Sequence, residues 1–376
     1  MPDWRIPLSD VDLDEREEEA VVRVVRSGWL TAGAEVRGFE QEFAQFVEAP
    51  DAVAVSNCTA ALHLACLALG AGPGVEVIVP SLTFVATANA VAVTGGRVVF
   101  ADCTSPADLT MDASGVERLI TPATTGIICM HYGGHPCEMD GLLELCRRHD
   151  LFLIEDAAHA PGGRWRERRL GTIGDVGCFS FFGNKNMTMG EGGVAVAREP
   201  EVLERIRLLR SHGMTTSSWD RFQGHAYEYD VRAAGFNYRL AELPAAVGRE
   251  QLRKLERNNL RRAALLERYS NRLAEVHGVE IPFAGRTDTA HLAVVLLDDG
   301  ERRDVVRTAL RDQGIQTSLH YPPAHLFDHY RSASGYGPGD LPVTEAVASR
   351  LVTLPLYATM TTDDVDEVCD CIAAFV

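Results

Sequence analysis

Along the first two thirds of this chain, short apolar runs of strand length alternate with segments in which apolar residues recur at helical spacing. Short apolar runs of strand length lie at residues 52–55, 77–80, 98–100, 127–130, 151–155, 177–182 and 194–197. Between them, apolar positions recur three and four residues apart, which is typical of amphipathic helices. Strands that alternate with helices at this spacing predict a mostly parallel sheet with helices on both faces. Right-handed crossovers would then bring the ends of the strands to one edge.

The remaining third predicts a second, smaller unit. Residues 213–230 are polar, carry Trp and Tyr, and show little periodicity, so we expect a surface loop or lid there. A long helical run then leads into predicted strands near 292–297 and 315–319 and predicted helices at 301–312, 343–350 and 362–375. The expected fold is therefore α/β, with a large domain at residues 1–240 and a small C-terminal α/β domain at residues 241–376. The large domain would include an N-terminal helical segment, which Asp12 and Glu15 open with the spacing of a capping box.

Composition narrows the class of protein. The 376 residues include 36 Lys and Arg against 53 Asp and Glu, a net charge of −17, and 46% are hydrophobic. This balance is typical of a soluble globular protein, and the acidic charge argues against a nucleic-acid groove or an anionic membrane surface. No apolar stretch reaches the length of a membrane span and the N-terminus has no signal-like apolar core, so we expect a cytoplasmic location. The nine cysteines lie mostly in apolar runs, which indicates buried thiols in a reducing compartment, and we expect no metal site.

One lysine and one aspartate are the candidate chemical groups. Lys185 follows the apolar run 177–182 among glycines, and a solvated loop lysine is the simpler alternative. An amine at the edge of an apolar wall can have a lowered pKa, which makes it a usable nucleophile. Asp156 follows the run 151–155, and open α/β sheets bind ligands at the carboxyl ends of such strands. A carboxylate beside a pyridinium nitrogen and a lysine for a Schiff base are what proteins supply to pyridoxal phosphate (PLP).

The surroundings of these two residues carry a resemblance. DAAHA at 156–160 and FSFFGNKNMTMGEGG at 179–193 resemble the DegT/DnrJ/EryC1/StrS family of sugar aminotransferases, a branch of the fold-type I PLP enzymes. The resemblance extends from about Trp29 to the C-terminus. It implies PLP as cofactor, Lys185 as the catalytic residue, and L-glutamate as the amino donor. It also implies a nucleotide-sugar substrate and a homodimer or higher homo-oligomer.

The resemblance assigns further residues to the site. The residues that it implies for cofactor binding are Cys58, Thr59, Phe84, Asp156, His159, Ser180 and Asn237. Those that it implies for the substrate are Trp29, Thr31, Arg239, His320 and Tyr321. Asn237 would act in the neighbouring subunit's site, although on local grounds it could equally cap a helix. Trp29 could likewise pack a helix, and Phe84 could belong to the core.

The sequence around Lys185 also bears on the reaction. F-G-N-K with a downstream G-E-G-G resembles family members that aminate carbon 4 of a nucleotide-linked 4-keto-6-deoxyhexose, with dTDP as the expected nucleotide. Amination of a 3-keto sugar nucleotide at carbon 3 stays open, as does a non-catalytic regulatory role. Retention of Asp156, Ser180 and Lys185 argues against the regulator. Dehydration at carbon 3 is disfavoured because that branch has histidine in place of Lys185.

Overall fold

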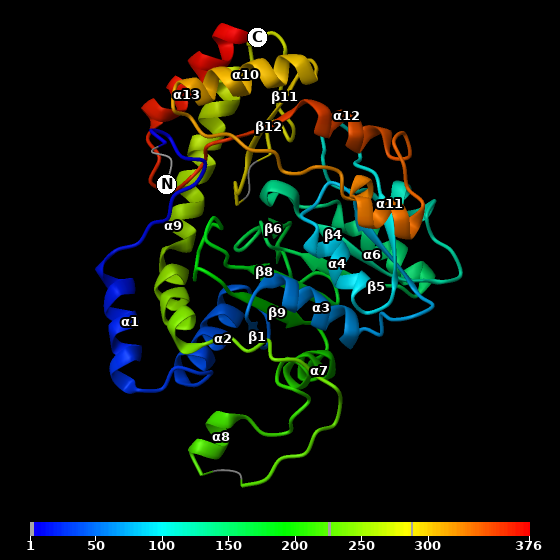
Figure 1. The fold of residues 1–376 in the computed structure, drawn as a ribbon, viewed down its shortest axis with the longest axis vertical. Helices are drawn as coiled ribbons and strands as arrows, with labels where there is room; N and C mark the ends of the chain where they lie inside the picture. The colour runs from blue at the N-terminus through cyan, green and yellow to red at the C-terminus, as the bar shows by residue number, and fades with distance from the viewer. Residues whose placement is uncertain (1–3, 225–226, 287–288) are drawn as a thin grey trace.

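A seven-stranded sheet forms the centre of the molecule in the computed structural model, which describes residues 4–224, 227–286 and 289–376 (Figure 1). Its strands, in the order of the sheet, are β1 (Val53–Val55), β9 (Gly193–Ala197), β8 (Val176–Ser180), β5 (Phe152–Asp156), β4 (Thr124–Met130), β2 (Glu76–Pro80) and β3 (Arg97–Ala101). Strand β9 is antiparallel to both of its neighbours, and the pairs from β8 to β3 are parallel. The predicted mostly parallel sheet is confirmed.

Helices cover both faces of this sheet because its strands are apolar on both sides. In β4, Ile127 belongs to one apolar core and the next residue, Ile128, to the other, since successive side chains of a strand point to opposite faces. The first core includes side chains of α2 (Ala34–Phe46) and α6 (Met139–His149). The second includes side chains of α3 (Cys58–Ala68), α4 (Ala86–Ala92) and α7 (Pro200–Arg210).

A 32-residue helix, α9 (Glu242–Leu273), runs along one side of the molecule (Figure 1). At its start, the carboxylate of Glu242 accepts hydrogen bonds from the backbone N–H groups of Gly33, Glu35 and Val36, where α2 begins. In its middle, the buried Lys254 donates to Glu17 of α1 (Glu15–Ser27) at 2.8 Å. The capping box of α1 is formed by Asp14 and Glu17, so the predicted box at Asp12 and Glu15 was two residues too early.

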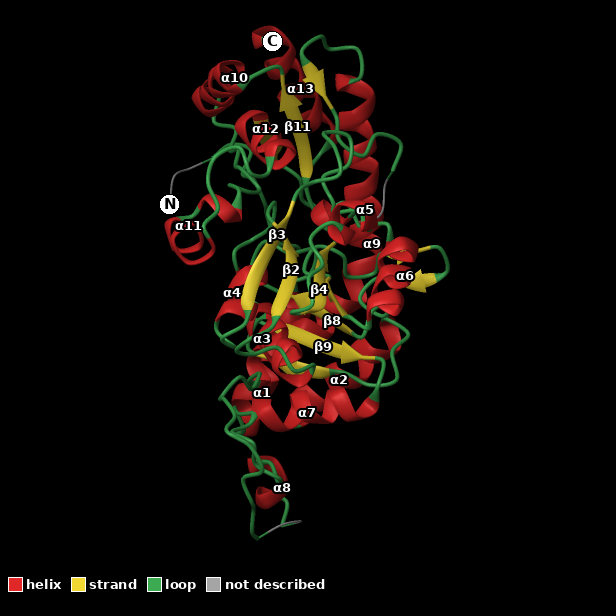
Figure 2. Ribbon diagram, turned by 90° about the vertical axis from the view of Figure 1, so that its right-hand side faces the viewer, coloured by secondary structure: helices red, strands yellow, loops and turns green. Residues whose placement is uncertain are grey.

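A second, three-stranded antiparallel sheet belongs to the C-terminal part of the chain and lies beyond one end of the large sheet (Figure 2). Its order is β10 (Val279–Glu280), β11 (Ala293–Leu297) and β12 (Leu351–Leu354), with α10 (Gly300–Asp312), α12 (Pro342–Arg350) and α13 (Thr362–Phe375) nearby. The α/β fold with a smaller C-terminal domain is confirmed. The strand predicted near 315–319 was wrong, because Ile315 and Ser318 form only isolated bridges, to Ile6 and Thr353. The boundary at residues 240 and 241 stays a prediction.

An arm extends from the body between α7 and α9 (Figures 1 and 2). It carries a short helix, α8 (Ser218–Phe222), within the segment predicted as a loop. The smaller elements elsewhere are α5 (Ala113–Glu117), η1 (Tyr132–Gly134), β6 (Arg164–Trp165), β7 (Arg168–Arg169), η2 (Ala324–Leu326) and α11 (Asp328–Ser334). Among the helices of the described segments, none is both long and apolar enough to cross a membrane. All nine cysteines are buried with free thiols, as the sequence predicted.

Candidate active site

A buried carboxylate lies at the carboxyl edge of the large sheet. Asp156 is the last residue of β5, and its Oδ2 accepts a hydrogen bond from Thr87 Oγ1 at 2.7 Å. Its Oδ1 accepts from the backbone N–H of Ala158 at 3.2 Å. Burial raises the pKa of Asp156, and these two hydrogen bonds and the charge of Lys185 oppose that rise. The carboxylate is therefore held in one orientation and has a cationic neighbour.

Lys185 lies in the loop that follows β8, where its backbone N–H bonds to the carbonyl of Phe182 at 3.0 Å. Burial lowers the pKa of its amine to about 8, although attraction to Asp156 opposes the shift. A lysine with this pKa is partly neutral near neutral pH, whereas an ordinary one is almost wholly charged. The predicted nucleophilic character of this residue therefore has a physical cause in the structure.

Histidine and tyrosine side chains surround the amine. The Nδ1 of His159 accepts the backbone N–H of Gly133 at 3.2 Å, so a neutral His159 carries its proton on Nε2. That Nε2–H group donates to the hydroxyl oxygen of Tyr321 at 3.0 Å. The hydroxyl hydrogen of Tyr321 is therefore available to another acceptor. Burial, with the charges of Lys185 and His320, holds the pKa of His159 well below its usual range. Burial also lowers the pKa of His320 to about 4, so neither ring is charged at neutral pH.

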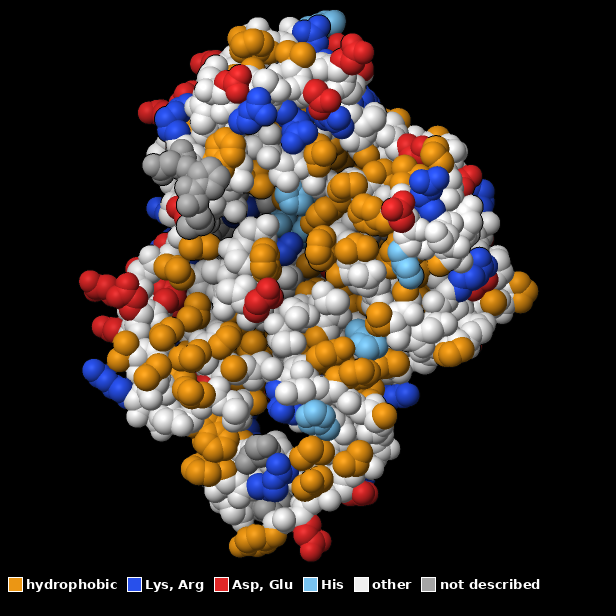
Figure 3. Space-filling view, viewed as in Figure 1, with side chains coloured by type: hydrophobic (Ala, Val, Ile, Leu, Met, Phe, Trp, Pro, Cys, Tyr) orange, Lys and Arg blue, Asp and Glu red, His pale blue; other side chains and the backbone are white. Residues whose placement is uncertain are grey.

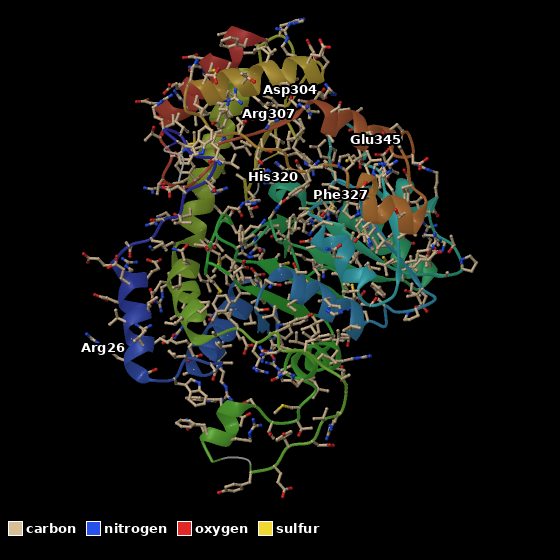
Figure 4. All side chains as sticks on the ribbon, in the orientation of Figure 1. Arg26, Asp304, Arg307, His320, Phe327 and Glu345 are labelled. Carbon is tan, nitrogen blue, oxygen red and sulfur yellow. The ribbon has the colours of Figure 1, made fainter. Side chains whose placement is uncertain are left out.

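The segment HYPPAHL (320–326) brings His320 and Tyr321 to this edge. It is fixed to the end of β2, because the N–H of Ala324 bonds to the carbonyl of Ser81 at 2.9 Å and His325 Nδ1 lies 2.7 Å from Ser81 Oγ. His320 lies near the middle of the molecule, between the two sheets (Figure 4). Histidine and cationic side chains are also visible on the surface near the middle of the molecule (Figure 3).

An aromatic ring lies beside Tyr321, and the start of a helix lies near Lys185. The ring of Phe84 is 55% exposed and lies 6.0 Å from that of Tyr321, so it is not part of the core. Helix α3 begins at Cys58, against Gly193 of β9, where a Cβ atom would lie 2.6 Å from the Cys58 nitrogen. Burial raises the pKa of the Cys58 thiol well above its usual range, and the charges of Asp156 and Lys185 both act on it. The start of α3 therefore lies within electrostatic reach of both.

Comparison with known proteins identifies the family. The sequence matches the DegT/DnrJ/EryC1/StrS aminotransferase family over residues 11–373. This chain is a member of that family. It is 39% identical over 375 residues to the spore coat polysaccharide biosynthesis protein SpsC of Bacillus subtilis, covering 98% of this chain and 96% of SpsC.

Solved structures agree with this assignment. The aminotransferase TlmJ from Streptoalloteichus hindustanus is 36% identical with a TM-score of 0.90, and each chain is covered to 98%. The PLP form of the putative sugar aminotransferase Spr1654 from Streptococcus pneumoniae is 27% identical with a TM-score of 0.91, again over 98% of each chain. The chain is a PLP-dependent aminotransferase. The predicted family, enzyme class and cofactor are confirmed.

The residues of this aminotransferase fit PLP. A pyridinium nitrogen needs a carboxylate, which Asp156 would supply, and the accessible ring of Phe84 would offer an apolar face to a flat heterocycle. A phosphate needs donors in a place that side chains leave open. Thr59 is exposed in the first turn of α3, and Ser180 ends β8 beside Gly193. The cofactor-binding roles of these residues stay predictions.

Four residues predicted for the site lie around the arm. The ring of Trp29 packs on those of Trp219 and Phe222 at 4.9 and 4.5 Å, and Thr31 is exposed. Arg239 donates to Ser211 Oγ at 3.1 Å and lines a cavity of about 760 Å³ between α2, α7 and the arm. A hollow between the arm and the body is visible in Figure 3. Asn237 is exposed, and its side chain has no hydrogen-bond partner among the residues with described positions.

Two residues that bond to the candidate chemical groups were missed by the sequence analysis, Thr87 at Asp156 and His291 at Lys185. Thr87 has no signal in its own segment, since it is one small residue in an Ala-rich helix. His291 precedes an apolar strand and lies 3.4 Å from the Lys185 amine, through its Nε2. Its place just before the start of a predicted strand could have drawn attention to it, but the partner 106 residues away could not be predicted from spacing.

Proposed function

We propose that this aminotransferase moves an amino group from L-glutamate to carbon 4 of a nucleotide-linked 4-keto-6-deoxyhexose, with dTDP as the nucleotide. The observation that carries the chemistry is the Lys185 amine, with its pKa of about 8, in the field of the buried Asp156. The regiochemistry rests on the F-G-N-K and G-E-G-G segments around Lys185.

Each side chain has a defined task in this proposal. When bound, PLP supplies an electron sink for the carbon that bears the reacting nitrogen. Asp156 would keep the ring nitrogen protonated, and His159 would contact the ring hydroxyl. Lys185 holds the cofactor covalently at rest, and its freed neutral amine then accepts and returns a proton. Thr59 and Ser180 bind the phosphate, together with the backbone at Cys58.

The substrate would be held by the segment that closes the site. His320 and Tyr321 face the Lys185 side of the edge, and Tyr321 has a hydroxyl hydrogen that His159 does not use. That hydrogen suits the keto oxygen of a sugar. Trp29 and Thr31, which lie at the arm, would supply a flat face and a hydroxyl for a sugar or a base. The name of SpsC refers to polysaccharide biosynthesis, and PseC of Helicobacter pylori, 25% identical, is described as acting in pseudoaminic acid biosynthesis.

A second copy of the chain would complete the site. Asn237 and Arg239 lie where the arm returns to the body, and the hydrogen bonds of neither reach Lys185 or Asp156. We therefore assign them to the site of a neighbouring subunit, where Asn237 would bind the cofactor phosphate and Arg239 the substrate. The functional unit is then a homodimer.

Incubation with L-glutamate and a panel of 3-keto and 4-keto sugar nucleotides tests the substrate. The panel includes dTDP, GDP and UDP derivatives, and products are identified by mass spectrometry and NMR, with Lys185→Ala protein as the blank. We expect amination of a dTDP-linked 4-keto-6-deoxyhexose at carbon 4. Amination of the 3-keto sugars alone would overturn the regiochemistry. Inertness toward the whole panel would overturn the substrate class. The panel includes this outcome because AHBA synthase, 29% identical, is named for an aminohydroxybenzoic acid and not for a sugar.

A further inference from the structure

The Lys185 amine has one hydrogen-bond partner among the residues with described positions, and that partner is His291. The Nζ–Nε2 distance is 3.4 Å. His291 is 4% exposed, and its backbone is held at both ends. Its N–H bonds to the carbonyl of Gly133 at 2.8 Å, and its carbonyl accepts from the buried guanidinium of Arg262 at 2.7 Å. The ring is therefore presented to the amine from a rigid backbone.

The tautomer of His291 follows from hydrogen bonds that end on backbone carbonyls. Asn259 Nδ2 donates to the carbonyl of Pro161 at 2.9 Å, which leaves Asn259 Oδ1 as an acceptor. Asn186 Nδ2 donates to that oxygen at 2.8 Å and to the carbonyl of Thr289 at 2.7 Å. Both of its hydrogens are thus used, and its Oδ1 can only accept.

The amide oxygen of Asn186 therefore determines which nitrogen of His291 carries the imidazole proton. Asn186 Oδ1 is 2.8 Å from His291 Nδ1, so that nitrogen must carry the hydrogen. The Nε2 atom of neutral His291 is then a bare lone pair, and it faces Lys185. Every donor in this chain of bonds points the same way, from the lysine amine through the histidine to the carbonyls of Thr289 and Pro161.

This direction matters to an amine that has to accept a proton. A neutral amine has two hydrogens and one lone pair. An Nε2 lone pair takes one hydrogen and leaves the amine's own lone pair free, whereas the opposite tautomer would donate to that lone pair and occupy it. We propose that His291, oriented by Asn186, is a positioning residue that holds the freed Lys185 amine with its lone pair available to the reacting carbon. The proposal rests on the proposed role of Lys185 as the proton carrier.

The charged groups around the pair are consistent with a neutral His291. The titratable groups that act on Lys185 or His291 are Asp156, Cys58, Arg262, His159 and His320. Burial, with His159, Lys185 and Arg262, holds the pKa of His291 well below its usual range. His291 is therefore a neutral acceptor beside the amine at neutral pH.

The first test uses the full chain freed of cofactor and measures the pH dependence of Lys185 acetylation by acetic anhydride, with peptide mass spectrometry. The wild-type midpoint should lie near 8. Because a hydrogen bond from a charged amine is stronger than one from a neutral amine, His291→Phe should lower the midpoint by roughly half to one pH unit. His291→Gln places an amide oxygen near the position of Nε2 and should restore it. His135→Phe, at an equally buried histidine stacked on Phe283, is the control and should leave the midpoint unchanged.

The second test is kinetic and uses the holoenzyme with L-glutamate deuterated at the α-carbon. In the half-reaction with L-glutamate alone, followed as a single turnover, His291→Phe should lower the maximal rate roughly 10- to 100-fold with little change in the glutamate concentration that gives half of that rate. It should also raise the isotope effect because proton transfer becomes slower. Asn186→Leu should act in the same direction, and the double variant should be no worse than His291→Phe, since both act through one chain of bonds.

Two outcomes for the variants would overturn the proposal. One is an unchanged acetylation midpoint and an unchanged maximal rate of the glutamate half-reaction in His291→Phe. The other is an equal loss in the Phe and Gln variants with an unchanged isotope effect, which would mean that His291 only fills space. Histidine ¹⁵N NMR with a protonated Nε2 at His291 would refute the tautomer directly. None of these measurements needs the sugar substrate, so they can be interpreted even if the sugar assignment is wrong. Absence of cofactor attachment to Lys185 would instead refute the role of Lys185 on which the proposal rests.

Discussion

Glu155, the residue before Asp156 in β5, is completely buried, and its carboxylate accepts four hydrogen bonds. Its Oε2 accepts from His131 Nε2 at 2.9 Å and from the N–H of Gly171 at 2.7 Å. Its Oε1 accepts from the N–H groups of Ile173 and Gly174 at 2.6 and 2.7 Å. His131 is the donor in its bond, because its Nδ1 already accepts a backbone N–H, that of Cys137, at 3.2 Å.

Glu155→Gln keeps the shape of this side chain and replaces one oxygen by an NH₂ group. Whichever way the amide turns, two of the four buried donors lose their acceptor and face another donor. At about 1–3 kcal/mol for each buried donor left unpaired, the substitution should lower the free energy of unfolding by about 2–6 kcal/mol. The loop that follows Gly171 should loosen first, because three of the four bonds hold it.

Urea denaturation of the cofactor-free proteins, followed by both fluorescence and circular dichroism, measures this loss. The exposed Glu144, which pairs with Arg147, supplies the control variant Glu144→Gln, whose midpoint should not move. A free energy for Glu155→Gln within about 1 kcal/mol of the wild type would refute the reasoning, since it is less than one buried donor should cost.

The pH dependence gives a second check on Glu155. Burial alone would raise its pKa, but the bonds from His131, Gly174 and Gly171 hold it below the ordinary 4.5. A carboxylate with a lowered pKa stabilises the fold above the ordinary value and loses that contribution as the pH falls through its folded value. The difference between wild type and Glu155→Gln should therefore shrink below about pH 4.5.

Three further outcomes are expected. Borohydride reduction of the holoenzyme and peptide mapping should place the cofactor on Lys185, and label on another lysine would refute its role. Thr87→Val removes the bond that favours the Asp156 carboxylate, so the pKa of Asp156 should rise and the acid limb of the pH–rate profile should move up by about one unit; an unmoved limb would contradict this. Lys185→Ala and Asn237→Ala proteins should regain activity on subunit exchange, whereas verified exchange without recovery would mean that each site is built from one chain.

The large sheet could be predicted from the sequence because its strands are apolar on both faces. They therefore form short continuous apolar runs, which differ from the spaced apolar residues of the helices. Asp156 and Lys185 could be found because each ends or follows such a run, and strand ends meet at one edge. The apolar residues of 315–319 misled the prediction for a physical reason. Ile315 is buried against the N-terminal Ile6, a partner that the local pattern does not reveal.

The finer parts of the site depend on distant pairs. Thr87 meets Asp156 across 69 residues, and Lys185 meets His291 across 106. Hydrophobic periodicity reports burial and says nothing about which polar groups meet inside. The orientation of His291 depends in turn on two backbone carbonyls, and a backbone carbonyl has no identity in a sequence.

The long helix α9 sets a constraint on the length of the chain. Glu242 holds the start of α2, Lys254 binds α1, and Arg262 holds the carbonyl of His291, all from one uninterrupted helix. One inserted residue would turn every later contact by about 100° and shift it by about 1.5 Å, so Arg262 would face away from His291. Related enzymes should therefore vary freely in length within the arm, while the 19 intervening positions, 243–261, should accept neither insertions nor deletions.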